Sequence, residues 1–211
     1  MPLNFGKLRS GEARTINFDF ADVATGQSYV LLYGMDTSEK YILTNLVNYG
    51  NSGATYAGAG TQLDLSFDMN VEKGFSVEGQ TYISVPIQFT HGAGFTPGVS
   101  NWNFFIRKSS ATSGINEDTL VSGQIVINIT GSITHKFLRK TINLEMPKTK
   151  FKKGEILRIT ISNSNTPTGA SYGIGHDPAN RDETQIENAP TGSSDWANSD
   201  LKVLLPIKIN Q

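Results

Sequence analysis

The chain has 211 residues, which suffices for one large domain with a substantial core. It contains no cysteine, so disulfides, thiolate metal sites and cysteine nucleophiles are excluded. Eighteen basic and nineteen acidic residues leave a net charge of −1, and no long basic stretch gives electrostatic support for binding nucleic acid or an anionic membrane. We therefore expect neither as a partner.

The first thirteen residues are polar, with three isolated apolar side chains at Leu3, Phe5 and Leu8. They lack the apolar core of a signal peptide, and no later run is long enough to span a bilayer. We predict that residues 1–13 form an N-terminal arm that orders on contact with a partner, and that 14–211 form a single β-sandwich domain. The protein is expected to be made in the cytoplasm without a signal peptide.

Strict two-residue alternation dominates the rest of the chain. In residues 63–71 every odd position is apolar and every even position is polar, which predicts a strand with one buried face. The same pattern recurs in residues 14–20, 81–89, 121–129, 157–161 and 201–209. Pro86 lies inside one of these segments without a backbone N–H, which predicts an edge position or a bulge there.

Other segments are less regular. Residues 41–47 fit either a strand or a short helical turn, and residues 48–60 carry four glycines, which predicts a loop. Residues 133–146 read as one long strand whose apolar phase changes midway, so we predict a β-bulge near residues 137–140. The basic segment 147–154 reads as a turn.

No segment has helical periodicity, so parallel folds that need crossover helices are excluded. Each of these strands has one apolar face that must be buried, so two packed sheets or a β-barrel remain possible. We predict an all-β, jelly-roll-like antiparallel β-sandwich of roughly eight to ten strands with little or no helix.

The histidines offer no recognised metal pattern. His91, His135 and His176 lack a second histidine or glutamate at zinc-ligand spacing, so we expect structural or surface roles. There is no Gly-x-Ser-x-Gly motif, so a catalytic triad has no sequence anchor. No catalytic residue and no cofactor is predicted.

Oxygen ligands cluster once, late in the chain. Asp177, Asn180, Asp182 and Glu183 supply the hard oxygen atoms that Ca²⁺ prefers, although their spacing does not match an EF-hand loop. The alternative is an ordinary turn in which Arg181 pairs with a neighbouring aspartate. The turn is the preferred interpretation.

Four acidic residues lie on predicted strands and alternate with apolar positions: Asp64, Asp68, Glu145 and Glu155. Facing carboxylates could hydrolyse a glycosidic bond, but alternation with core residues places them on a solvated outer face. We therefore expect no enzyme activity.

Two tryptophans remain. Trp102 shares parity with Phe104 and Ile106, which predicts a core position. Trp196 lies in a polar segment and is the candidate for an exposed contact residue, unless it anchors its own loop.

Three parts of the chain together resemble the jelly-roll virion structural proteins of tailed phages and related viruses, which decorate heads or build spikes. They are residues 14–20 with 29–34, residues 151–159, and residues 175–182. The resemblance implies a non-enzymatic virion protein that docks on a capsid lattice and reinforces it. It also implies contacts with other virion proteins and a homo-oligomer, with a trimer favoured. An alternative from another class is a carbohydrate-binding jelly roll that holds a glycan with Trp196 and residues 48–60.

Overall fold

The protein is all-β. The computed structural model describes residues 7–8, 12–13, 27–37, 39–46, 53–57, 62–91, 94–110, 117–129, 135–164, 167–177 and 200–208, and none of these is helical. No helix that could cross a membrane occurs in that part of the chain. The thirteen strands among the described residues are β1 (Lys7–Leu8), β2 (Glu12–Ala13), β3 (Gln27–Asp36), β4 (Tyr41–Thr44), β5 (Gly53–Ala57), β6 (Asp64–Asn70), β7 (Phe75–His91), β8 (Gly98–Ser109), β9 (Glu117–Ile129), β10 (His135–Phe151), β11 (Ile156–Ser164), β12 (Ala170–Asp177) and β13 (Lys202–Lys208). The predicted fold class is confirmed.

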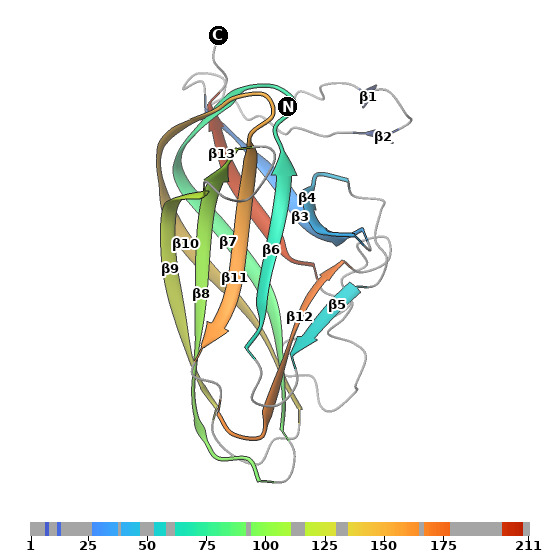
Figure 1. The fold of residues 1–211 in the computed structure, drawn as a ribbon, viewed down its shortest axis with the longest axis vertical. Coiled ribbons are helices and arrows are strands. Elements are labelled where there is room, and N and C mark those ends of the chain that lie inside the picture. Colours follow the sequence, from blue (N-terminus) through green and yellow to red (C-terminus); the bar gives the residue numbers. More distant parts are fainter. Residues whose placement is uncertain are drawn as a thin grey trace, which may run out of the picture.

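Strands β3 to β13 form one sheet that curls into two facing layers, while β1 and β2 pair separately (Figure 1). The front layer has the order β6-β11-β8-β9, and the back layer contains β10, β7, β13 and β3, with β12 and β5 continuing beside β7. Short β4 links the layers, because it pairs with β3 on one side and with β6 on the other. The described ladders are antiparallel except for the pairing of β4 with β6. A single curled sheet of eleven strands therefore makes both layers of the sandwich.

The core lies between the layers and follows the predicted alternation. In the front layer Phe67, Ile159 and Ile106 are paired across three strands, and each is fully buried. In the back layer the paired row is Leu32, Val203 and Ile83. Paired residues of neighbouring strands point to the same face, so each row covers the other layer with continuous apolar surface. Trp102 is also fully buried, as its parity predicted.

Strand β7 branches the sheet. One edge of β7 pairs with β10. The other edge pairs with β13 over residues 76–84 and with β12 over residues 87–91. Pro86 falls between these two ladders, where no backbone N–H is needed. The missing donor is thus accommodated at a branch point, rather than at an outer edge or in a bulge.

Two of the irregular segments contain strands. Residues 41–44 form strand β4, not a helical turn. The predicted loop over residues 48–60 contains strand β5, which pairs with β12 from Tyr172 to Asp177. A Gly-rich segment has little strand propensity of its own, so this strand depends on its partner.

The predicted bulge near residues 137–140 is wrong. The β10–β7 ladder runs without a shift from His135 to Met146, and its register changes between Met146 and Thr149. Pro147 lies in that interval and cannot donate to the ladder, which explains the position of the irregularity. The predicted turn over residues 147–154 is shorter, because β10 continues to Phe151.

The predicted N-terminal arm contains one described feature. Strands β1 and β2 pair antiparallel, and Leu8 lies in β1. Leu3 and Phe5 lie outside the described residues.

Candidate functional site

A polar network covers the outer face of the front layer. Its positions are dictated by the same alternation that buries Leu157, Ile159 and Ile161 in β11, because Arg158 and Thr160 must then point outward. Neighbouring strands add outward side chains beside them: Ser66 and Asp68 from β6, Arg107 from β8 and Glu117 from β9.

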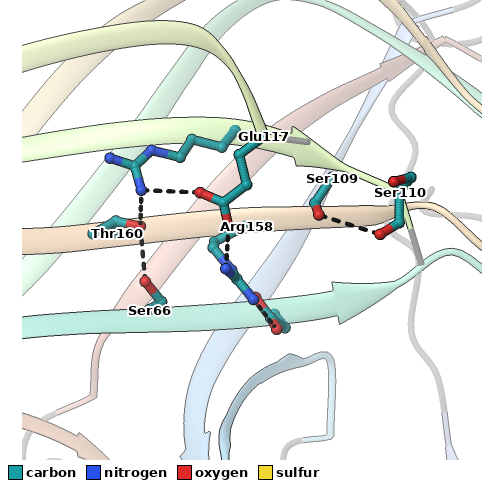
Figure 2. A network of polar contacts seen from close by, with 8 residues as sticks. Ser66, Ser109, Ser110, Glu117, Arg158 and Thr160 are labelled. Atoms are coloured by element: carbon teal, nitrogen blue, oxygen red, sulfur yellow. Dashed lines mark hydrogen bonds and ion pairs between the residues drawn. The ribbon is translucent and has the colours of Figure 1, made fainter. Parts of the chain in front are cut away.

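Arg158 is the centre of this network. Its Nε and Nη2 donate to the two carboxylate oxygens of Asp68 at 2.6 and 2.8 Å, in the bidentate geometry that suits guanidinium and carboxylate. Its Nη1 donates to Glu117. Because Arg107 also pairs with Glu117, this carboxylate lies between two guanidinium groups (Figure 2). The side chains of Asp68 and Glu117 are 14% and 17% exposed, so the charges are partly removed from water.

Arg107 completes the network on the far side of Glu117. Its Nη1 donates to Glu117 at 3.2 Å and lies 3.4 Å from the hydroxyl of Thr160, which in turn lies 2.9 Å from the hydroxyl of Ser66. The guanidinium also stands 4.7 Å from the centroid of the Phe105 ring. Thr160 is buried although it is on the outer face, because the long arginine side chains cover it.

The network is electrically balanced, with two arginines and two carboxylates. The hydrogen bond to Asp68 is the main cause of a raised Arg158 pKa, and the charges of Asp68 and Glu117 act in the same direction. The guanidinium therefore stays ionised and cannot transfer a proton. The Ser66 and Thr160 hydroxyls lie beside arginine rather than beside a histidine base, so this arrangement orders the sheet face instead of activating a nucleophile.

The four acidic residues considered as paired carboxylates do not come together. Asp68 belongs to the network, and Asp64 is exposed on the same strand. Glu145 lies in the back layer on β10 and accepts a hydrogen bond from Gln80. Glu155 lies in the turn before β11, 2.9 Å from Lys108 Nζ.

His176 is a core residue. It is 1% exposed, and its ring makes edge-on contacts with Tyr41 at 5.3 Å and with Phe67 at 5.7 Å between centroids. His91 and His135 lie on β7 and β10, and nothing of their side chains is described. No group of three metal-ligating side chains occurs among the described residues.

The remaining predicted site residues fall largely outside the described part. Asp177 ends β12, while Asn180, Asp182, Glu183 and Trp196 lie beyond the described residues. The calcium interpretation and its turn alternative are therefore untested.

The Arg158–Asp68 pair was missed by the sequence interpretation, which placed Asp68 on an outer face without a partner. The two residues are 90 positions apart and meet only because β11 and β6 align Arg158 directly opposite Asp68. Opposite charges at outward positions of two predicted strands were the available signal, but the sequence does not give the strand order.

No family model and no curated protein matches the chain, so the resemblance to phage virion proteins is untested. Solved structures do match. Two crystal structures of a CocE/NonD family hydrolase from Staphylococcus aureus give TM-scores of 0.54 and 0.55 at 14% and 12% sequence identity. They cover 95% and 98% of this chain but only 40% of the hydrolase.

An aminopeptidase from the marine sediment archaeon Thaumarchaeota archaeon matches with a TM-score of 0.56 at 8% identity, over 88% of this chain and 37% of the aminopeptidase. At such identities the likeness shows the fold. The chain spans well under half the length of the hydrolases that share this fold.

These matches contradict the prediction of a non-enzymatic virion protein that decorates a capsid. The structures named above that share the fold are hydrolases, and none is a virion protein. The expectation of no enzymatic role is contradicted for the same reason. The carbohydrate-binding alternative rested on Trp196, which lies outside the described residues, and on a loop through which β5 runs.

Proposed function

We propose that this chain is the β-sandwich unit of a hydrolase, and that it works together with a second unit that carries the catalytic nucleophile. The observation that carries the proposal is the share of each protein that the structural match covers. Nearly the whole chain corresponds to a 40% share of a CocE/NonD family hydrolase, as expected if the chain were one unit of a larger enzyme.

The site chemistry of this chain supports a scaffolding role within such an enzyme. The polar network on the front layer is neutral, hydrogen-bonded and built on strands, so it holds a sheet face in a fixed shape. Its hydroxyls lack a base, and the described histidine ring is packed against Tyr41 and Phe67. The nucleophile and its base are therefore expected on the second unit.

Peptide and ester bonds are the substrate classes to test first. One of the proteins with this fold is an aminopeptidase, and nucleophilic hydrolases commonly cleave both activated esters and amides. The experiment compares the recombinant chain with the assembly recovered through a tag on the same chain in its native source. Both are incubated with p-nitrophenyl acetate, p-nitrophenyl butyrate and a set of aminoacyl p-nitroanilides.

The expected result is hydrolysis of at least one substrate by the assembly, at a rate well above that of a mock purification from an untagged source. The recombinant chain should be inactive. Hydrolysis by the recombinant chain would place the nucleophile in this chain and overturn the division into two units. Absence of hydrolysis in both samples would overturn the proposal as a whole.

A further inference from the structure

Four polar side chains lie together inside the sandwich. Ser100 and Trp102 are two residues apart on β8 and therefore face the same way, and Trp102 is paired with Asn163 on β11. From the facing layer, Tyr172 on β12 brings its ring to within 5.9 Å of the Trp102 ring, measured between centroids. Each of the four residues is at most 2% exposed. We call them the interior polar cluster.

Every member of the interior polar cluster has one buried atom without a hydrogen-bond partner among the described residues. These atoms are Ser100 Oγ, Trp102 Nε1, Asn163 Nδ2 and Tyr172 Oη. Buried polar groups of folded proteins are nearly always hydrogen-bonded, either to the protein or to ordered water. Because the four residues are neighbours, one shared partner accounts for them better than four separate exceptions.

Asn163 is held in a fixed orientation. Its Oδ1 accepts a hydrogen bond from the backbone N–H of Leu63 at 2.6 Å, and its own N–H donates to the Leu63 carbonyl at 3.0 Å. The first contact also decides which atom of the amide is the nitrogen, because a backbone N–H must donate to the oxygen. The Nδ2 group of Asn163 therefore has to find its acceptor inside the cluster.

The two hydroxyls are close to each other but not directly bonded. Burial raises the pKa of the Tyr172 hydroxyl, and the Ser100 hydroxyl is near enough to oppose this effect. Neither oxygen nevertheless has a hydrogen bond of acceptable geometry to a described residue. A small bridging group between the two oxygens would satisfy both.

The unpaired atoms match the hydrogen-bonding capacity of water. Trp102 Nε1 and Asn163 Nδ2 only donate, whereas the hydroxyls of Ser100 and Tyr172 also accept. A water molecule accepts from donors of the first kind and donates to oxygens of the second kind. None of the four side chains is charged at neutral pH, so the cluster suits a neutral ligand rather than an ion.

We propose that the interior polar cluster is a hydration site. At least one ordered water molecule bridges the Ser100 and Tyr172 hydroxyls and accepts a hydrogen bond from Trp102 Nε1 or Asn163 Nδ2, since buried water makes roughly three hydrogen bonds. This water links the front layer, which holds Ser100, to the back layer, which holds Tyr172. The inference goes beyond the proposed function and does not depend on it.

The direct test is a crystal structure of the purified full chain at a resolution that shows ordered solvent. The expected result is a water molecule within hydrogen-bonding distance, roughly 2.7–3.2 Å, of Tyr172 Oη and of at least one other unpaired atom of the cluster. Absence of solvent density there would overturn the proposal, whether the four atoms then bond to one another or stay unpaired.

A double-mutant cycle tests the shared partner in solution. Tyr172→Phe and Ser100→Ala should each lower the urea midpoint of unfolding, and the double variant should lose less than the sum of the two losses, because one water serves both hydroxyls. Ser162→Ala, on the outward side of β11, is the matched control, and its loss should add to that of Tyr172→Phe. Additive losses for Ser100→Ala and Tyr172→Phe as well would overturn the proposal.

Discussion

Arg158 illustrates how a charged residue becomes part of a packed sheet surface. Its guanidinium closes two ion pairs on an outer face while the strand beneath it is held by Leu157 and Ile159. A surface ion pair contributes little by itself, but this one is bidentate, partly buried and shared between two carboxylates. Its removal leaves Asp68 and Glu117 without their shared cation.

We predict that Arg158→Met lowers the free energy of unfolding by about 1–2 kcal/mol, because hydrogen bonds to two charged groups are lost and water screens part of the effect. Urea unfolding monitored by fluorescence measures this change. Lys73→Met, in an exposed turn, is the matched control and should change stability by less than about 0.5 kcal/mol. If the two variants are equally stable, the network does not contribute measurably to the stability of the fold.

Tyr172 gives a prediction on pH. Burial raises the pKa of its hydroxyl from 10.0 to about 12, against a smaller opposing effect of the Ser100 hydroxyl. Between these values the unfolded chain releases the phenolic proton and the folded chain keeps it, so stability must fall as pH rises.

Tyr172→Phe removes this proton and should flatten the loss of stability between pH 10 and pH 12. The comparison requires denaturant unfolding of both proteins at several pH values in that range. The remaining tyrosines are common to both proteins, so they cancel in the difference. Parallel pH profiles would show that Tyr172 ionises as readily in the folded protein as in the unfolded one.

At the scale of elements, the approach of β9 to β10 depends on a glycine. A Cβ added at Gly123 would lie 2.6 Å from Leu144 Cδ2 and 2.8 Å from Ile142 Cδ1. The side chains of β10 therefore pack directly against the backbone of β9, which draws the last strand of the front layer toward the back layer.

We predict that Gly123→Val costs about 1–3 kcal/mol, because the added methyl groups push apart two packed strands. Ser122→Val, the adjacent outward position, should change stability by less than about 0.5 kcal/mol. Thermal and urea unfolding of both variants measure the difference. A Gly123→Val variant as stable as Ser122→Val would mean that β9 does not pack closely on β10.

The sequence was sufficient to predict an all-β fold, but not that the sheet branches at β7. Alternation in residues 63–71 and 121–129 reports which side chains face a core, and the buried Phe67 and Ile127 confirm it. Strand β5 escaped prediction because its extended state comes from pairing with β12 rather than from its own residues. Pro86 signalled an interrupted ladder, yet only the pairing of β7 with both β12 and β13 reveals a branch.

The site was less predictable than the fold for a related reason. Arg158, Asp68 and Glu117 come from three strands, and their meeting depends on strand order and register. His176 was predicted to be structural or on the surface, and its packing against Tyr41 and Phe67 resolves the choice in favour of the core.

At the scale of the whole molecule, both outer faces of the sandwich expose large apolar side chains beside polar ones. The front face carries the ion-pair network centred on Arg158 and also exposes Val99 and Val126, while the back face exposes Leu31 and Tyr82.

The proposed role of this chain as one unit of a larger hydrolase can be tested directly in its native source. The most direct test is size-exclusion chromatography of the native assembly, with every fraction assayed for ester and aminoacyl p-nitroanilide hydrolysis and probed for this chain. We predict that activity and chain elute together, at a mass greater than that of two copies of the chain. Elution of the chain at the mass of one or two copies, away from any hydrolytic activity, would contradict it.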